Sequence, residues 1–348
     1  MPNDVILGTY DLEKKVEDTV IILDTTVRNY GDPNRAVMIE SGIIQLSKSN
    51  GEIGDNGIPV LLINGYGARI NGLGDTFVGI GNDVNTMSVN PAGLSIIESK
   101  EVSVVYMKYP EDFNFSYSGF GYRLRDDYGV VGINVALFKM GEFIEYNSIG
   151  EETGNNLQAG DFQIGISYAT KPLKFLKIEK ELNGGISIKY INSTLASDTV
   201  KLIVFDLGLL YKMDIINLGR KKSNNFGIGM AIQNIGIINN EEVAIPMNYR
   251  AGIGYNIYSD RVNDILIGID VNKQTESETV VSIGIEYEIM KIVTLRAGYK
   301  LLGNKFENLS FGIGGGHNIS GYNIRMDYAN IPLSEIGSVH TFSLGVKF

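Results

Sequence analysis

The chain contains 348 residues, with 42 glycines, no cysteine and a formal net charge of −10. The lack of cysteine excludes disulfide scaffolds, thiolate metal sites and cysteine nucleophiles, and an acidic balance without a basic stripe argues against nucleic acid as a partner. The mean hydropathy is +0.02, and no stretch approaches the ~18 consecutive apolar residues of a membrane helix, so a helical membrane protein is excluded.

Residues 1–66 have a mixed composition, and their start, MPNDVILGTYDLEKK, lacks the basic and apolar regions of a secretory signal. If the protein is exported, we therefore expect its signal to have been removed or replaced. The stretch DLEKKVEDTV favours a helix with Asp11 as its N-cap, although Lys14 holds the position at which a capping box needs Glu or Gln. We interpret residues 1–66 as an N-terminal extension that forms part of a plug.

Residues 67–100 are rich in glycine and asparagine and contain the motif Asn-Pro-Ala-Gly-Leu at positions 90–94. The Asn90 side chain can accept a hydrogen bond from a backbone N–H ahead of it, and Pro91 suits the first position of a helical turn. One interpretation is a cap on a short helix within the plug. The other is a hatch that a ligand must pass, with Asn90, Pro91, Ala92, Gly93 and Leu94 as the predicted hatch residues.

From residue 101 to residue 348 the sequence repeats runs of alternating polar and apolar residues, separated by turn residues. In VTLRAGYKL, Val293, Leu295 and Tyr299 share one face of a strand, whereas Arg296 and Lys300 share the other. About fourteen such runs, each roughly ten residues long, match tilted strands that cross a bilayer, so the pattern predicts a closed antiparallel transmembrane β-barrel over residues 101–348. The runs begin near Val102, Phe113, Val130, Phe162, Gly185, Leu202, Phe226, Tyr249, Asp264, Val280, Val293, Leu309, Tyr322 and Thr341.

A soluble antiparallel sandwich also alternates, with its apolar face inward. Two features favour the membrane barrel over the sandwich. The runs exceed the length of about five or six residues that is most common in soluble strands, and the polar face carries charges of both signs, which suits a wet lumen. These charges are Arg250, Asp270, Glu286, Arg296, Lys300, Arg325 and Asp327.

Four cations of the predicted lumen face have two possible roles. They can hold a carboxylate headgroup of a ligand through charge-assisted hydrogen bonds. More often such residues pair with acidic side chains of the same lumen and pin the plug. The four cations are Arg250, Arg296, Lys300 and Arg325.

The only two histidines, His317 and His340, share strand parity with Phe311 and Phe342 and are therefore predicted to face lipid. A nucleophilic triad needs a histidine that faces the lumen or a cleft, and a zinc site needs three or four convergent ligands. The stretch 72–81 lacks the third glycine of a dinucleotide fingerprint. We therefore expect no catalysis, no metal site and no other cofactor.

The connections between the runs suggest a topology. If both chain ends lie on the inner side of the membrane, the longest connection, residues 139–160, falls outside, as barrels of this kind require. The connections 170–183 and 212–225 then fall inside, although they are long and basic where short inner turns are typical.

The stretch GARINGLGDTFVGIGNDVNTMSVNPAGL at 67–94 resembles the N-terminal signature of the FadL-like outer-membrane proteins, with a stronger likeness to their PorV/PorQ branch and to related spirochaete barrels. Within 264–300, a Gly-x-Glu-Tyr strand followed by Arg-Ala-Gly-Tyr is also similar to this family. The terminal FSLGVKF is similar to the β-signal that barrel-assembly machinery reads. The resemblance covers residues 67–348.

The resemblance implies a fourteen-stranded barrel of the bacterial outer membrane whose N-terminal segment enters the lumen as a hatch. It implies transport of hydrophobic small molecules, expected to be long-chain fatty acids, with the lipid bilayer and an apolar ligand such as a fatty acid or detergent as partners. The alternative, implied by the PorV branch, is a binding or scaffold barrel that engages secreted or envelope proteins. The long basic inner connections and residues 1–66 favour this alternative.

Overall fold

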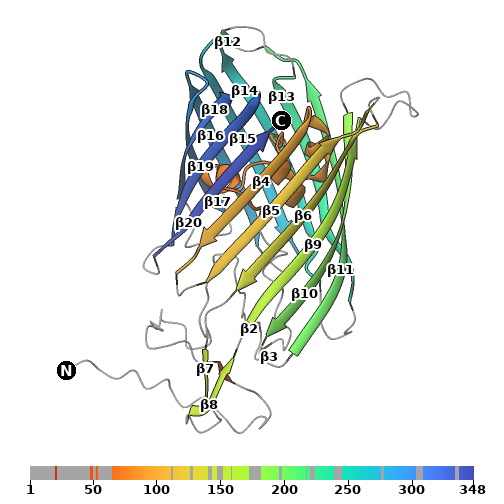
Figure 1. The fold of residues 1–348 in the computed structure, drawn as a ribbon, viewed down its shortest axis with the longest axis vertical. Coiled ribbons are helices and arrows are strands. Elements are labelled where there is room, and N and C mark those ends of the chain that lie inside the picture. Colours follow the sequence, from red (N-terminus) through yellow and green to blue (C-terminus); the bar gives the residue numbers. More distant parts are fainter. Residues whose placement is uncertain are drawn as a thin grey trace, which may run out of the picture.

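The structure is a computed structural model, and Figure 1 shows one barrel with short helices inside it. Within the described residues, no helix is both long enough and apolar enough to cross a bilayer. The structure describes residues 65–348 apart from 111–112, 126–127, 140–142, 147–151, 158, 172–181, 196–197, 217, 220–223, 239–244, 276–277, 303–308 and 334–336, together with residues 20–21, 48–49 and 52–53.

Fourteen antiparallel strands close into a barrel, because β14 pairs with β15 and the last strand, β20, pairs with the first, β4. The predicted fold class is therefore confirmed. The largest difference in a strand start lies at β11, which begins at Asp198, four residues before the predicted Leu202. The strands are β4 (Lys100–Lys108), β5 (Asn114–Arg123), β6 (Val130–Lys139), β9 (Ala159–Thr170), β10 (Leu182–Leu195), β11 (Asp198–Met213), β13 (Phe226–Ile238), β14 (Asn248–Ser259), β15 (Asp264–Gln274), β16 (Thr279–Ile289), β17 (Val293–Leu302), β18 (Leu309–Ile319), β19 (Tyr322–Pro332) and β20 (Ser338–Lys347).

Side chains alternate between the two faces of the wall as the sequence pattern predicts. On β17, Leu295 and Tyr299 are 45% and 43% exposed on the outer face, whereas Arg296 is 4% exposed and faces the lumen. On β16, Ile285 is exposed in the same way and the neighbouring Glu286 is buried. A closed wall with an apolar outer face and no free strand edge is what a bilayer requires. The chain is therefore an outer-membrane β-barrel.

We expect an arginine in place of Ile285 to weaken the barrel in lipid, because Ile285 lies at mid-strand on the outer face of β16. A cation at the bilayer midplane costs about 2–4 kcal/mol, and this cost falls to about 0–1 kcal/mol near the interfaces. The same substitution at Val293, which begins β17 at the barrel rim, is the matched control. Urea unfolding in phospholipid vesicles measures both losses. Equal losses would contradict the assignment of this outer face to lipid.

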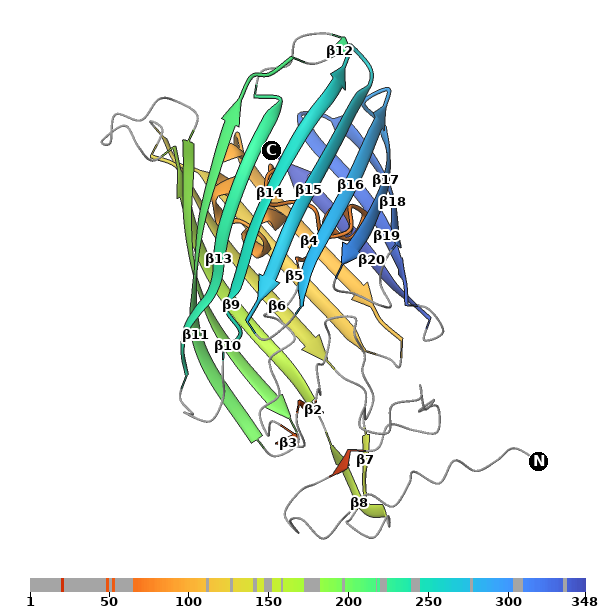
Figure 2. The same ribbon diagram turned by 180° about the vertical axis from the view of Figure 1, so that it is seen from behind.

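The C-terminus and the β7–β8 hairpin lie at opposite ends of the barrel (Figures 1 and 2). This hairpin belongs to the connection 139–160, which thus lies at the end opposite to the C-terminus, as predicted. The connection 212–225 contains β12, which pairs in parallel with the last residues of β14. Of residues 1–66, the structure describes only residues 65 and 66 and three short strands. The predicted contribution of the rest to a plug lies outside the described residues. The short strands of the chain are β1 (Val20–Ile21), β2 (Lys48–Ser49), β3 (Glu52–Ile53), β7 (Phe143–Tyr146), β8 (Glu152–Leu157) and β12 (Leu218–Gly219).

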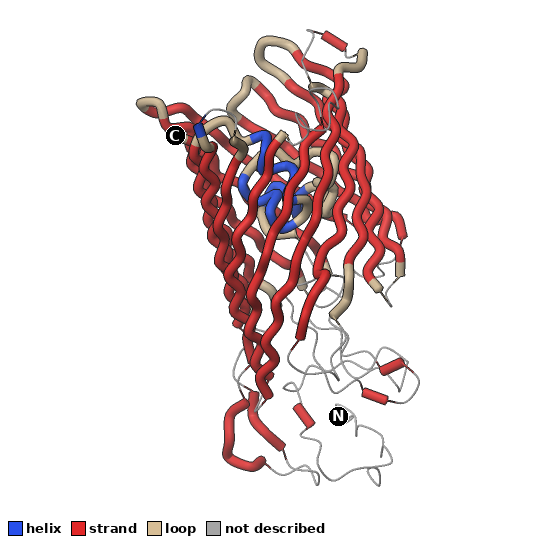
Figure 3. The backbone as a smooth tube through the Cα atoms, turned by 90° about the vertical axis from the view of Figure 1, so that its right-hand side faces the viewer, coloured by secondary structure: helices blue, strands red, loops and turns tan. Residues whose placement is uncertain are grey.

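Residues 65–97, here named the inner segment, lie inside the barrel in the half nearer to the C-terminus (Figures 1 and 3). Local capping explains where its two 3-10 helices begin: the Asp83 side chain accepts a hydrogen bond from the Asn85 N–H, and the Asn90 side chain accepts one from the Ala92 N–H. The helices are α1 (Ala68–Gly72) and the 3-10 helices η2 (Val84–Ser88) and η3 (Pro91–Ile96).

A buried apolar group occupies the lumen on the other side of the inner segment, in the half away from the C-terminus. Along β4 and β5, the surroundings of the lumen-facing side chains change from one end of the barrel to the other. Glu101 accepts a hydrogen bond from the Val84 N–H, and Gly121 lies against Ile97, so these parts of the two strands contact the inner segment. Farther along the same strands, the lumen-facing side chains are apolar. We name this group the apolar cluster; it includes Tyr66, Met107, Phe115, Tyr117, Phe138 and Leu202.

Candidate functional site

Asn90 holds together two parts of the inner segment and attaches both to the wall. Its Oδ1 accepts a hydrogen bond from the Ala92 N–H at 3.1 Å, which caps η3. Its Nδ2 donates to the carbonyl oxygens of Val78, at 3.0 Å, and of Leu209 on β11, at 3.1 Å. The side chain is fully buried. The predicted helix cap, with Pro91 at the first helical position, is confirmed.

The rest of the predicted hatch motif lies close to wall positions that are occupied by glycine. Pro91, Ala92, Gly93 and Leu94 are all buried. A Cβ atom at Gly208 of β11 would lie 2.1 Å from the Asn90 Oδ1. A Cβ atom at Gly185 of β10 would lie 2.4 Å from the backbone N of Ala92. Glycine in these two strands therefore lets the backbone of η3 approach the barrel wall closely.

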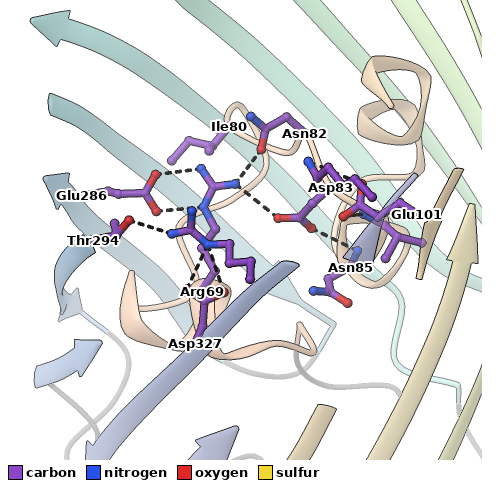
Figure 4. A network of polar contacts seen from close by, with 12 residues as sticks. Arg69, Ile80, Asn82, Asp83, Asn85, Glu101, Glu286, Thr294 and Asp327 are labelled. Carbon is purple, nitrogen blue, oxygen red and sulfur yellow. Dashed lines mark hydrogen bonds and ion pairs between the residues drawn. The ribbon is translucent and has the colours of Figure 1, made fainter. Parts of the chain in front are cut away.

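Arg69, on α1, joins the inner segment to a second part of the wall. Its Nε and Nη2 donate to the two carboxylate oxygens of Glu286 on β16, both at 2.8 Å (Figure 4). Its Nη1 donates to Asn82 Oδ1 at 2.6 Å and lies 3.2 Å from Asp83 Oδ2. A bidentate pair between guanidinium and carboxylate fixes both distance and orientation. Arg69 thus ties α1, the loop before η2 and the wall into one unit.

The ion pairs continue along the wall from Glu286. Arg296 Nε contacts Glu286 Oε2 at 2.7 Å, and its Nη1 contacts Asp327 Oδ1 at 2.8 Å. Arg325 in turn contacts Asp327 at 3.1 Å and Glu288 at 3.6 Å. Two of the four predicted lumen cations, Arg296 and Arg325, therefore have carboxylate partners within the protein.

The other two predicted lumen cations lie elsewhere on the wall. Arg250 is buried on β14 and interacts electrostatically with Asp270. Lys300 is half-buried on β17, close to the end of that strand. The structure therefore does not bring the four predicted cations into one group.

The charge state of Arg69 is secured by its neighbours. Burial by itself lowers the pKa of the Arg69 guanidinium, but the carboxylates of Glu286 and Asp83 more than offset this and hold the pKa well above its ordinary value. Arg69 consequently stays charged near neutral pH. Its attraction to Glu286 then weakens only when the carboxylate is protonated.

Two further wall side chains bind the backbone of the inner segment. The Asp270 Oδ2 atom accepts hydrogen bonds from the N–H groups of Phe77, at 2.6 Å, and Val78, at 2.8 Å. On the neighbouring side, Lys212 Nζ donates to the Gly79 carbonyl oxygen at 3.0 Å. Asp270 and Lys212 satisfy backbone groups that would otherwise be buried without partners. Sequence reasoning placed Asp270 in the lumen but missed both roles, since neither follows from strand periodicity.

The two histidines lie where strand parity predicts. His317 is exposed on the outer face of β18, and His340 shares the outer face of β20 with Phe342. The His340 Nδ1 atom is 2.9 Å from the Tyr328 hydroxyl. Among the residues that the structure describes, no three His, Cys, Asp or Glu side chains are grouped so that they could hold a metal ion.

Comparison with known proteins gives a likeness in fold. No protein-family model matches the chain, and no curated protein matches it in sequence. The toluene transporter TbuX of Ralstonia pickettii superposes with a TM-score of 0.51 at 13% identity, over 81% of this chain and 97% of that one. The toluene transporter TodX of Pseudomonas putida superposes with a TM-score of 0.50 at 14% identity, over 82% of this chain and 97% of that one. At such identities the likeness establishes a common barrel fold.

Proposed function

We propose that this barrel transports hydrophobic small molecules across the outer membrane, past the inner segment. The observation that carries the proposal is the arrangement of the lumen, in which an apolar cluster lies directly beside an inner segment held by polar contacts. The shared fold with two proteins described as toluene transporters supports it. Long-chain fatty acids, which the resemblance to FadL-like proteins implies, are one candidate cargo within this proposal.

The contacts of the inner segment suit a part that moves while the wall stays intact. The wall is held by its own ladder of backbone hydrogen bonds around the full barrel. The inner segment is held instead by individual side chains, above all Asn90, Arg69 and Asp270. Water can replace such contacts one by one: the net worth is about 1 kcal/mol for a neutral hydrogen bond such as that of Asn90, and about 1.5–3 kcal/mol for each bond to the charged Arg69 or Asp270. A ligand would enter the apolar cluster, displace part of the inner segment and leave on its far side.

A second function, protein binding at the C-terminal end of the barrel, is favoured by one observation. In the connection 212–225, Ile216 is 87% exposed and Leu218 is 62% exposed. Exposed apolar side chains that lie together in a connection are typical of surfaces that bind other proteins. A barrel that engages secreted or envelope proteins would use this end.

The proposal is tested by mass spectrometry of lipids and other apolar molecules extracted from the purified folded barrel. We expect enriched apolar molecules in the unaltered protein and their loss when Asn90→Ala and Pro91→Ala are combined. Removing Asn90 deletes the hydrogen bonds to Val78 and Leu209 that fix η3 to the wall. Asn318→Ala is the control, because the Asn318 side chain is exposed and accepts a hydrogen bond from the Gly321 N–H within a turn. If no apolar molecule is enriched in any of several detergents, the transport proposal fails and the protein-binding function gains support.

A further inference from the structure

The apolar cluster contains a buried polar atom, the hydroxyl oxygen of Tyr117, that has no hydrogen-bond partner among the described residues. Tyr117, on β5, is 1% exposed, and its ring lies 5.3 Å from the ring of Tyr66, centroid to centroid. Its hydroxyl makes no hydrogen bond within the part of the chain that the structure describes. A buried tyrosine hydroxyl normally finds a partner, since leaving it without one costs free energy. A phenylalanine at this position would fill nearly the same space without that cost.

The hydroxyl lies where the apolar cluster meets the inner segment. A Cβ atom built on Gly119 would lie 3.0 Å from the Tyr117 hydroxyl oxygen and 3.3 Å from the Met87 Cε of η2. Met87 and Met107 belong to the two groups that meet here. Methionine side chains are unbranched and repack easily around different shapes. A small molecule can therefore gain room beside the hydroxyl through movement of these two side chains.

Charge restricts which molecule can bind there. Within the described residues, Asp83 and Glu101 interact electrostatically with Tyr117, and both are acidic. Each already has a cation of its own: Asp83 pairs with Arg69, and Glu101 with Lys347 at 3.5 Å. A carboxylate brought to the Tyr117 hydroxyl would approach two acids without gaining a cation, whereas a neutral acceptor would meet no such repulsion.

We infer that Tyr117 selects the cargo: its hydroxyl donates a hydrogen bond to a neutral acceptor oxygen on an otherwise apolar molecule, such as a ketone, ester or alcohol. The inference rests on the proposed transport function and narrows its substrate class. Pure hydrocarbons bind the apolar cluster without this hydrogen bond. Ionised fatty acids bind less well than neutral molecules of the same size.

The test uses the full chain in phospholipid nanodiscs and three probes of similar size, namely acetophenone, ethylbenzene and benzoate at pH 8. Equilibrium dialysis against empty nanodiscs measures the binding of each probe. We expect acetophenone to bind more tightly than ethylbenzene, and benzoate to bind least. Tyr117→Phe should weaken acetophenone binding about 5–10-fold, the worth of one buried neutral hydrogen bond, and leave ethylbenzene binding unchanged.

The matched control is Tyr106→Phe, because Tyr106 lies on the same pair of strands but is 42% exposed on the outer face. This control should leave the binding of all three probes unchanged. Folding is checked by thermal unfolding, in which Tyr117→Phe should be at least as stable as the unaltered protein. If Tyr117→Phe weakens the binding of ethylbenzene and acetophenone equally, or if benzoate binds most tightly of the three, the inference about Tyr117 is overturned. The transport proposal itself is unaffected by either result. No binding of any probe would overturn both.

Discussion

Replacing Arg69 with glutamine will destabilise the inner segment and open the lumen. The change leaves the Glu286 carboxylate with a single guanidinium partner, Arg296, and removes the link to Asp83. The Arg69 and Glu286 side chains are only 15% and 12% exposed, so the pair is largely shielded from water. Breaking a buried pair by removing one partner costs about 3–5 kcal/mol. We expect faster protease cleavage within residues 65–97 and a higher conductance in planar bilayers.

The control for Arg69 is an ion pair at the barrel rim. Lys291 contacts Asp264 and Glu288 but is 39% exposed, so Lys291→Gln should change the free energy of unfolding by about 1 kcal/mol or less. The double variant Arg69→Gln with Glu286→Gln tests whether the two side chains stabilise the protein through their mutual contact. If Arg69 and Glu286 act on each other, the double variant loses less than the sum of the two single losses. Additive losses would show that Arg69 acts through other contacts.

A single methyl group at Gly298 should displace the inner segment. A Cβ atom there would lie 2.1 Å from the backbone N of Gly74 and 2.3 Å from the carbonyl carbon of Leu73. Both atoms belong to the backbone, so no side-chain rotation relieves the overlap. Overpacking of this kind costs about 1–3 kcal/mol. We expect Gly298→Ala to keep its barrel strands while the inner segment becomes sensitive to protease and the lumen admits small polar solutes.

Gly345→Ala is the matched control for this substitution. Gly345 lies in β20, and the nearest atom to an added Cβ is the Val102 carbonyl oxygen at 3.9 Å, an ordinary contact. Liposome swelling with small sugars and limited proteolysis, run side by side, compare the two variants. If Gly298→Ala proves as tight and as resistant as Gly345→Ala, the close fit between inner segment and wall is not what closes the lumen.

Strand periodicity was enough to predict the wall of this barrel. A run such as VTLRAGYKL alternates because successive strand residues point to opposite faces, and lipid on one side with a polar lumen on the other keeps that alternation regular. The strand starts predicted at Val130, Phe226, Asp264 and Val293 coincide with the observed ones. Starts were missed by up to four residues where a strand runs beyond the membrane-like pattern, as β11 does.

The contacts inside the barrel were much less predictable. Parity placed Arg296 and Glu286 on the lumen face but did not pair them with Arg69, which lies 217 positions from Glu286 in the sequence. The close contacts of η3 with Gly185 and Gly208 could not be predicted either. The sequence does not show whether another backbone lies against a glycine in a strand. Asn90, whose cap is a local interaction, could be predicted from its neighbours.

The closure of β20 onto β4 imposes an order on the assembly of the protein. Lys100 and Phe348 exchange backbone hydrogen bonds at 3.1 and 2.9 Å, so the first wall strand finds this partner only when β20 has been synthesised. The inner segment immediately precedes β4, and its helices contact strands on several sides of the wall, among them β5, β10 and β18. Because the described strands form a closed ladder, a nascent barrel either gathers its wall around this segment before the seam forms or threads the segment through one mouth afterwards. Such non-local pairing makes folding slow. If the inner segment binds the first strands early, it provides a surface on which the remaining strands pair and the barrel closes.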